Sequence, residues 1–212
     1  MIKVSFSLDD GSIYDLRSAD MLNGYGYDAT FYIPVNWQRY LLGKGIDPLT
    51  WDNIVDLATR FTIGSHGVNH DLLTRSSEDV QNREIFHSIK WWKEKGFDVN
   101  SFCPPRGYYD DKIKAKVRQA GYKDARTVKV GYIGEPEDPF ETHTTAHLGY
   151  DRDEYETDWL TYAKDKVKEA IERDQDSHLR FWWHSEEVHR YQQWDRLGNF
   201  LRFLHENIEV PE

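Results

Sequence analysis

The sequence predicts an α/β fold in which a parallel sheet is covered by helices, as a barrel, closed or incomplete, or as an open doubly wound sheet. Two observations support this prediction. Short runs rich in apolar and β-branched residues alternate along the chain with segments of helical pattern. The length of 212 residues suits one domain with a sizeable core, and no internal repeat or low-complexity linker divides it. We therefore expect a single domain over residues 1–212.

The predicted strands follow one another with a helix in most of the gaps. Strands are expected at residues 2–8, 29–35, 61–66, 99–105 and 178–184, and a further one at 122–130. Helices are expected at residues 13–24, 51–60, 77–95, 110–120, 158–173 and in the last segment. Residues 134–156, with Pro136 and Pro139, are expected to be irregular.

Local signals justify several of these helices. The segment 77–95 opens with serine and acidic residues, which favour a helix N-terminus, and the segment 110–120 is followed by Gly121, which favours a C-cap. The last segment carries one apolar stripe at helical spacing. Its members are Trp194, Leu197, Leu201 and Leu204.

Composition excludes several classes of protein. The formal net charge is -10, which argues against a surface for nucleic acid or anionic membrane, although a local basic pocket remains compatible with it. The single cysteine, Cys103, allows no internal disulfide and fits a reducing compartment. The N-terminus lacks a signal-peptide pattern, and no apolar run approaches the roughly 20 residues that span a bilayer. We expect a cytoplasmic protein without membrane insertion.

Polar residues recur where the predicted strands end. Asp9 and Asp10 follow the first strand, His66 ends the third, and His184 ends the last. Pro104, Pro105 and Arg106 end the fourth. In parallel sheets ligands bind beyond the carboxyl ends of the strands, so these residues are expected to share one site.

The residue types at these ends indicate a metal site. His66 and His70 have the four-residue spacing that lets two imidazoles bind one ion. With one carboxylate they form a two-histidine, one-carboxylate set that leaves positions open for water and substrate. Asp-Gly is also a common turn dipeptide, but a bound cation would explain why Asp9 and Asp10 tolerate each other. A second HxxxH pair, His143 and His147, has no such carboxylate, and we expect His147 to contact substrate.

Four sequence motifs together resemble those of the polysaccharide deacetylase family, also called the NodB-homology family or carbohydrate esterase family 4. "SLDDG" is similar to the family's "TFDDG", and "SHGVNH" to its His-[Ser/Thr]-x-x-His, with Gly67 at the hydroxyl position. "FCPPRGYYD" resembles "FRPPYG", and the segment from "RFWWHSEE" onward resembles the last motif. The motifs come in family order from Ser7 to Leu204, and the resemblance implies a distorted, probably incomplete (β/α) barrel.

The resemblance also implies a role for each matching residue. Asp9 corresponds to the catalytic base, and His184 to the acid that protonates the departing amine. Asp10, His66 and His70 correspond to the metal ligands. The family removes acetyl groups from N-acetylated, sometimes O-acetylated, sugars with a divalent ion, usually zinc, with cobalt, manganese or nickel as alternatives.

The chain departs from the family pattern around the base. Cys103 stands where the family usually has the arginine that pairs with the base. Arg106 and Arg126 are the candidates to replace it, and Arg126 is favoured because it ends a later strand run. A backbone N–H near Arg106 matches the family's oxyanion donor.

Further aromatic residues are candidates for the substrate contacts. Trp182 and Trp183 alternate across a strand, so that only one of them faces the pocket, and we expect it to be Trp183. Tyr108 is a second candidate. The family's fourth motif, "DWxxW", has no clear counterpart here.

The resulting hypothesis is a metal-dependent hydrolase that removes acetyl groups from an N-acetylated carbohydrate, either a small molecule or an oligosaccharide. Two alternatives stay open: a hydrolase of a non-sugar, cyclic amide on the same fold, and a non-catalytic carbohydrate-binding relative. A non-haem iron oxygenase is a weaker idea, since its usual His-x-Asp arrangement is absent. The oligomeric state and the particular sugar are not predicted.

Overall fold

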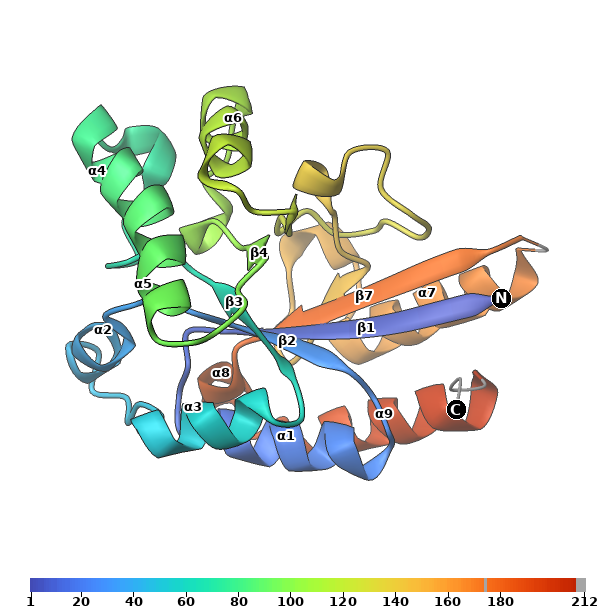
Figure 1. Ribbon diagram of the computed structural model, residues 1–212. Helices are drawn as coiled ribbons and strands as arrows, with labels where there is room; N and C mark the ends of the chain where they lie inside the picture. Colours follow the sequence, from blue (N-terminus) through green and yellow to red (C-terminus); the bar gives the residue numbers. More distant parts are fainter. Residues whose placement is uncertain (174, 209–212) are drawn as a thin grey trace.

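A curled parallel sheet is the frame of the structure. The computed structural model describes residues 1–173 and 175–208. Within them, seven strands form one sheet in the order β5-β4-β3-β2-β1-β7-β6, and all paired strands are parallel (Figure 1). The strands are β1 (Ile2–Asp9), β2 (Ala29–Ile33), β3 (Thr62–Ser65), β4 (Ser101–Phe102), β5 (Asp124–Ala125), β6 (Ala146–His147) and β7 (Ser177–Trp183). This half-barrel confirms the predicted distorted, incomplete (β/α) barrel.

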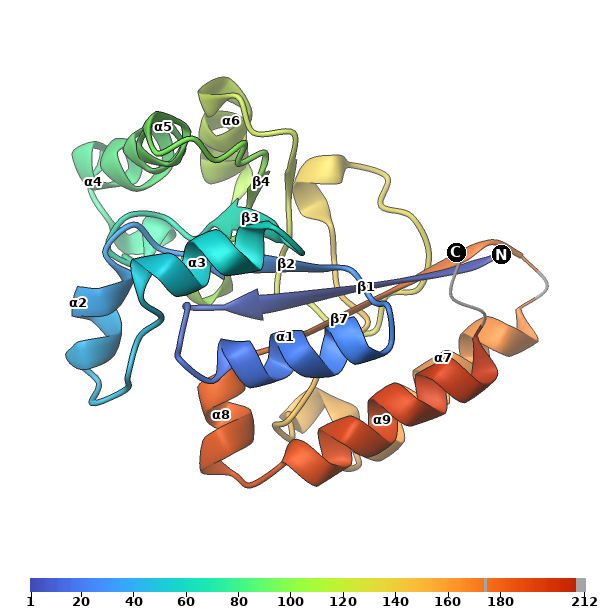
Figure 2. The same cartoon turned by 60° about the horizontal axis from the view of Figure 1, so that its bottom comes forward.

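Helices cover the outside of this sheet. They are α1 (Asp15–Gly24), α2 (Trp37–Leu42), α3 (Trp51–Ala58), α4 (Glu78–Asn82), α5 (Ser88–Glu94), α6 (Asp111–Ala120), α7 (Trp159–Glu172), α8 (Ser185–Arg190) and α9 (Trp194–Asn207). Helix α7 contacts β6, β7 and α9, and α1 contacts α3 and α8 (Figure 2). Helices α3 and α5 pack on β3. No helix in the described ranges is long and apolar enough to cross a bilayer.

The central strand pair is long and buried. β1 pairs with β7 from Ile2 opposite Ser177 to Leu8 opposite Trp183. Phe6 and Phe181 lie 5.8 Å apart between ring centroids, and both are almost fully buried. Strands covered on both faces have nearly continuous apolar runs, and burial of each large side chain stabilises the fold by about 1.5–3 kcal/mol. The core therefore holds the carboxyl ends of these strands rigidly.

Several predicted elements differ from the observed ones. The single helix expected at residues 77–95 is two helices, α4 and α5, joined by a π-helical turn at Arg83–His87. The strand expected at 122–130 is only β5, because beyond Arg126 the chain leaves the sheet after one isolated bridge to Thr142. Helices α2 and α8 and the short strand β6 were not expected, since they lack a repeated apolar period.

The carboxyl ends of the strands carry the polar residues. Because all paired strands are parallel, β1, β3, β4 and β7 end at the same edge of the sheet. Asp9 is the last residue of β1, while His66, Cys103 and His184 directly follow β3, β4 and β7. The structure therefore brings these strand ends together, as expected from the sequence.

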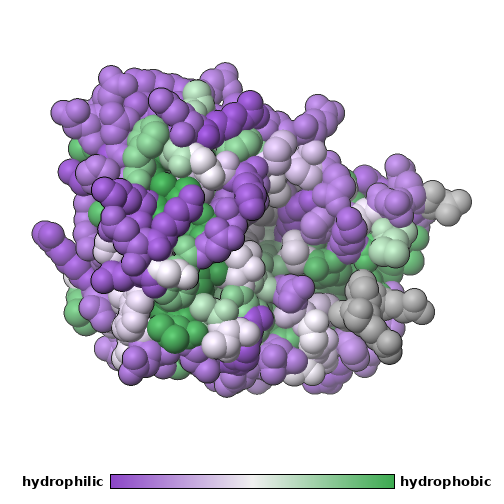
Figure 3. Space-filling view, viewed as in Figure 1, coloured by the Kyte–Doolittle hydropathy of each residue, from purple (hydrophilic) through white to green (hydrophobic). Residues whose placement is uncertain are grey.

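An apolar groove lies away from the polar residues at the strand ends. Figure 3 shows apolar atoms on the face that carries α3 and α5, where a groove of about 530 Å³ is lined by Trp51, Val55 and Phe97 among others. Lys95 and Asp98 are the ionisable residues of this lining. The groove is thus larger than the polar cavity at the strand ends, but no histidine or cysteine of the described residues lines it.

A close approach between β2 and β3 yields the first prediction. Gly64 lies opposite Tyr32, and a Cβ at Gly64 would come within 2.5 Å of the Tyr32 ring. We expect Gly64→Ala to lower the free energy of unfolding by about 1–3 kcal/mol, because the buried ring has to shift. Urea unfolding measures this change. Gly24→Ala is the control, since a Cβ there meets nothing within 4 Å, and equal stability of the two variants would contradict the prediction.

Candidate metal and acid–base site

A polar cavity of about 350 Å³ lies at the carboxyl ends of the strands. The end of β1, the loops after β3, β4, β5 and β6, the end of β7 and α8 line it, together with Tyr40 and Lys44 from the α2 region. The lining consists of Asp9, Asp10, Tyr40, Lys44, His66, His70, Arg106, Val128, Arg152, Trp182, His184, Glu186 and Glu187. The catalytic and metal candidates from the sequence meet here, except Arg126, which lies behind Asp9.

Asp10, His66 and His70 form a compact triad. Oδ1 of Asp10 is 3.6 Å from Nε2 of His66 and 3.3 Å from Nε2 of His70. Ligand atoms about 2.0–2.2 Å from a tetrahedral ion are separated by about 3.3–3.6 Å, so this spacing fits one ion. Asp10 and His70 both have positive φ, 81° and 64°, which is uncommon for residues other than glycine and is found at binding sites.

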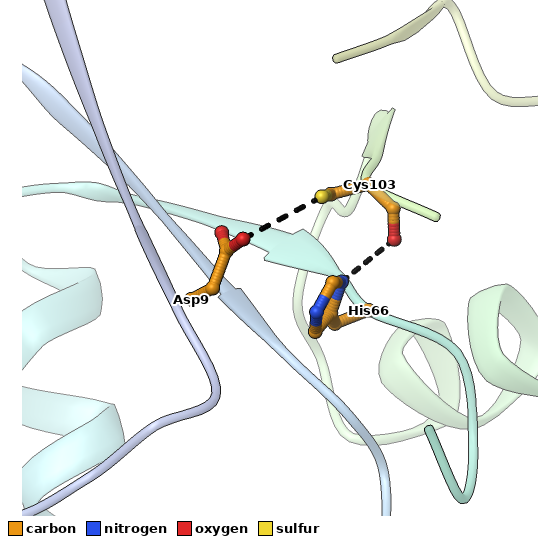
Figure 4. Close-up of side chains that lie close together, drawn as sticks. All are labelled: Asp9, His66 and Cys103. Atoms are coloured by element: carbon orange, nitrogen blue, oxygen red, sulfur yellow. Dashed lines mark hydrogen bonds between the residues drawn. The ribbon is translucent and has the colours of Figure 1, made fainter. Parts of the chain in front are cut away.

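The chemistry of the donor atoms also fits a cation. Cys103 O accepts a hydrogen bond from Nδ1 of His66 at 2.7 Å, which leaves Nε2 of this ring with its lone pair toward Asp10 (Figure 4). Burial lowers the pKa of His66 to about 4, so the ring is neutral at neutral pH. Oδ1 of Asp10 is buried and has no hydrogen-bond partner. A divalent ion would satisfy this oxygen and both imidazoles.

Asp9 is held apart from this triad by its own partners. Arg126 donates to Oδ1 of Asp9, and both side chains are buried. Burial by itself raises the pKa of Asp9, but the charge and hydrogen bond of Arg126, with the charge of His184, outweigh it and hold the pKa below its usual value. Of the two candidate arginines, Arg126 therefore forms the pair with Asp9, as favoured from the sequence.

Cys103 contacts the other oxygen of Asp9. Its Sγ lies 3.8 Å from Oδ2, within range of a weak S–H donation (Figure 4). Asp9, His66 and Cys103 are close enough to form a second ligand set. However, burial raises the pKa of the Cys103 thiol well above its usual value, and a protonated thiol is a poor metal ligand. The set with Asp10 is better suited to an ion.

His184 faces the triad from the other side of the cavity. Its Nδ1 bonds to Oε2 of Glu187 at 3.1 Å, and Nε2 of His147 lies 3.4 Å from the same oxygen. Burial opposes a charge on His184, but the Glu187 hydrogen bond and the charges of Asp10 and Glu186 prevail and raise its pKa to about 10. A protonated imidazole is thus favoured in the cavity, as a proton donor requires.

The histidines of the second HxxxH pair lie apart. His147 is stacked on Trp182, with ring centroids 4.0 Å apart, and is not part of the cavity lining. His143 bonds to Thr127 and lines a different hollow with Tyr132. His147 thus lies beside Glu187, and this residue, expected to contact substrate, does not line the cavity.

Two further residues expected to contact substrate, Trp183 and Tyr108, do not line the cavity. Trp183 is fully buried, and its Nε1 donates to Ser18 Oγ in the core. Because side chains alternate along β7, Trp182 faces the cavity instead. The Tyr108 ring packs against Arg75, with the guanidinium carbon 4.7 Å from its centroid, and does not line the cavity.

Glu84, which no sequence motif indicated, holds the histidine loop. This buried carboxylate of the π-helical turn accepts hydrogen bonds from backbone N–H groups of Val68 at 2.9 Å and Asn69 at 2.9 Å. A Cβ on Gly67, which has φ 80°, would lie 2.7 Å from Oε2 of Glu84. The carboxylate therefore explains why glycine occupies residue 67, and a lone acid in a helix offers no motif that reveals it.

Comparisons with known proteins show to which family the chain belongs. The polysaccharide deacetylase family model matches residues 2–125, more than half of the chain, so the chain belongs to the polysaccharide deacetylase family. The peptidoglycan-N-acetylglucosamine deacetylase of Bacillus cereus is 26% identical over 125 residues, which are 57% of this chain and 54% of that protein. The chain thus spans about half the length of the curated relative it matches.

Solved structures share the fold. The deacetylase PplD of Streptococcus pyogenes, in complex with acetate, has a TM-score of 0.58 at 21% identity, covering 66% of this chain and 62% of that one. A family 4 carbohydrate esterase from Streptomyces lividans has a TM-score of 0.57 at 13% identity, covering 96% and 88%. A family 4 pseudoenzyme from Bacillus anthracis also matches, at 0.58 and 15%, covering 97% and 60%. At these identities the likeness concerns the fold alone.

The Glu84 anchor yields a prediction about metal affinity. We expect Glu84→Gln to weaken zinc binding about tenfold or more, because the loop carrying His66 and His70 loses a carboxylate that accepts its N–H groups. Competition with a chromogenic chelator measures the dissociation constant. Glu78→Gln, at an exposed position of α4, is the control. Unchanged zinc affinity in the Glu84 variant would show that the anchor is irrelevant to the ligands.

Proposed function

We propose that this chain is a metal-dependent hydrolase that removes the acetyl group from an N-acetylated carbohydrate. One observation carries the proposal: a buried, unpartnered oxygen of Asp10 lies within 3.6 Å of two imidazole nitrogens. Membership of the polysaccharide deacetylase family supports the same activity. Asp10, His66 and His70 are the proposed ligands of a divalent ion, with zinc as first choice and cobalt, manganese or nickel as alternatives.

The base side of the reaction belongs to Asp9. A bound dication would lower the pKa of a water and polarise the acetyl carbonyl. Asp9, kept ionised by Arg126, takes a proton from the water that attacks the carbonyl carbon. Arg126 is therefore a positioning residue, because it acts through Asp9. A backbone N–H at Arg106 is the proposed donor to the oxyanion.

The acid side belongs to His184. The C–N bond breaks as His184 gives its proton to the departing nitrogen, which yields acetate and a free amine. Glu187 stabilises the protonated ring through its hydrogen bond to Nδ1 and so directs Nε2 to the cavity. Asp9 and His184 thus hold opposite charges before the reaction starts, as a paired base and acid require.

Two alternatives are kept because particular observations favour them. The cavity carries no feature that demands a sugar, so a cyclic amide of non-sugar type remains compatible with the same groups. A family 4 pseudoenzyme shares this fold, so a non-catalytic carbohydrate-binding protein is the second alternative. Release of acetate from a panel of N-acetyl sugars separates these alternatives, since a cyclic amide releases no acetate. The single domain over residues 1–212 and the location in the cytoplasm stay predictions.

The assignment of ligands and base is tested by two variants. We expect His66→Ala to lose the metal, because only two of the three proposed ligands remain. We expect Asp9→Asn to keep the metal but to have a turnover about 10²–10⁴ times lower, because the base is lost. Elemental analysis of purified protein and an acetate-release assay measure the two effects. A fully active Asp9→Asn protein would defeat the assignment, and so would full metal content in His66→Ala.

The assignment of His184 is tested by the pH profile. Glu187 raises the pKa of His184, so Glu187→Gln lowers it, and the acid loses its proton at a lower pH. We expect the descending limb of kcat/KM at high pH to move to lower pH. A metal on Asp10 lowers the pKa in both proteins alike, so the difference persists. Glu172→Gln at the exposed end of α7 is the control. A high-pH limb of kcat/KM that does not shift in Glu187→Gln would contradict the role of His184 as the acid.

A further inference from the structure

Lys44 and Arg106 are among the cations that line the catalytic cavity, in a protein whose net charge is -10. We propose that they bind an anionic group of the sugar substrate, a carboxylate or a phosphate, beside the N-acetyl group. The inference rests on the proposed deacetylase function and names its substrate class.

Lys44 reaches into the cavity from the turn after α2. Its ammonium lies 3.9 Å from the centroid of the Tyr40 ring and donates to the Tyr40 hydroxyl. It is 3.8 Å from Oδ2 of Asp10, and its side chain is 38% exposed. A dication on Asp10 draws on the same carboxylate and repels the ammonium, so Lys44 becomes available to another anion when the metal site is filled.

Arg106 is placed at the cavity by a tightly packed loop. The φ angle of Arg106 is 54°. The next residue, Gly107, has a φ of 70°, and a Cβ at Gly107 would lie only 2.1 Å from the Val128 side chain. A left-handed conformation is uncommon in a bulky residue and persists where the surroundings impose it. Arg126 and Arg152 pair with Asp9 and Glu154, whereas Arg106 forms no ion pair within the described residues.

The two cations act on the same place. Lys44 donates to the Tyr40 hydroxyl, and Tyr40, Lys44 and Arg106 line the same cavity of about 350 Å³. The positive charges of Lys44 and Arg106 repel each other, and an anion bound between them would attract both.

Four carboxylates line the cavity, and none of them is a ready partner for both cations. Glu186 is 6% exposed and forms no ion pair within the described residues, and its burial disfavours the charged form. Asp9 is engaged by Arg126, and Glu187 is engaged by His184 and His147. Asp10 faces the proposed ion. Since the cations line the cavity that holds the catalytic groups, the matching anion belongs to the molecule that binds there.

The test compares charged and neutral substrates on the metal-loaded protein. The substrates are N-acetylglucosamine, its 1-phosphate, its 6-phosphate and N-acetylmuramic acid, which together separate a phosphate from a carboxylate and one position from another. We expect at least one anionic sugar to have a kcat/KM about tenfold or more above that of neutral N-acetylglucosamine. We expect Lys44→Gln and Arg106→Gln each to reduce this ratio about threefold or more, and salt to reduce it as well.

The ratio is the readout because a uniform loss of activity leaves it unchanged. Lys90→Gln and Arg118→Gln, at surface ion pairs away from the cavity, are matched controls that keep the ratio. A neutral sugar that equals every anionic one would overturn the proposal, and so would a preference that survives in both cavity variants.

Binding separates failure of this inference from failure of the proposed function. Calorimetric titration of metal-loaded protein with N-acetylglucosamine 6-phosphate and with N-acetylmuramic acid reports recognition without turnover. Binding that is lost in Lys44→Gln and Arg106→Gln supports the anion site even where no acetate is released. Binding that persists in both variants places the anion on the metal alone and refutes the role of the two cations.

Discussion

The adjacent carboxylates of Asp9 and Asp10 are the constraint on which the rest of the site depends. Both are buried at the end of β1, where two unpaired negative charges would be costly. The structure compensates each in a different way. Asp9 pairs with Arg126, and Asp10 faces two imidazoles with an oxygen that lacks a partner. This division separates a group suited to proton transfer from one suited to an ion.

Rigid backbone keeps that division in place. Asp10 and His70 sit in the left-handed region, and the backbone N–H of Asp10 bonds to Tyr32 O at 3.0 Å. The carboxylate of Glu84 gathers N–H groups of the loop between the two histidines. Strained residues of this kind persist only where neighbouring contacts hold them. The side chains are therefore aimed before any ion or substrate arrives, which lowers the reorganisation required during binding.

Electrostatics across the cavity then gives Asp9 and His184 opposite preferences for a proton. The pKa of Asp9 is held low by the cations around it, while that of His184 is raised by Glu187, Asp10 and Glu186. An ionised carboxylate and a protonated imidazole coexist in one cavity because each is surrounded by charge of opposite sign. In the proposed reaction these two groups are the base and the acid, and the proposed anion site with Lys44 and Arg106 would act on the bound molecule.

The sequence by itself determined the parallel α/β class, the positions of most strands and the set Asp9, Asp10, His66, His70 and His184. It did so because period, turn residues and motif spacing are local properties that a chain carries without folding. Tertiary structure decided which arginine meets Asp9, which of two neighbouring tryptophans faces the cavity, and that Glu84 and Glu187 support the histidines. Those contacts join residues distant in the chain, or depend on the strand face, so only packing could select them.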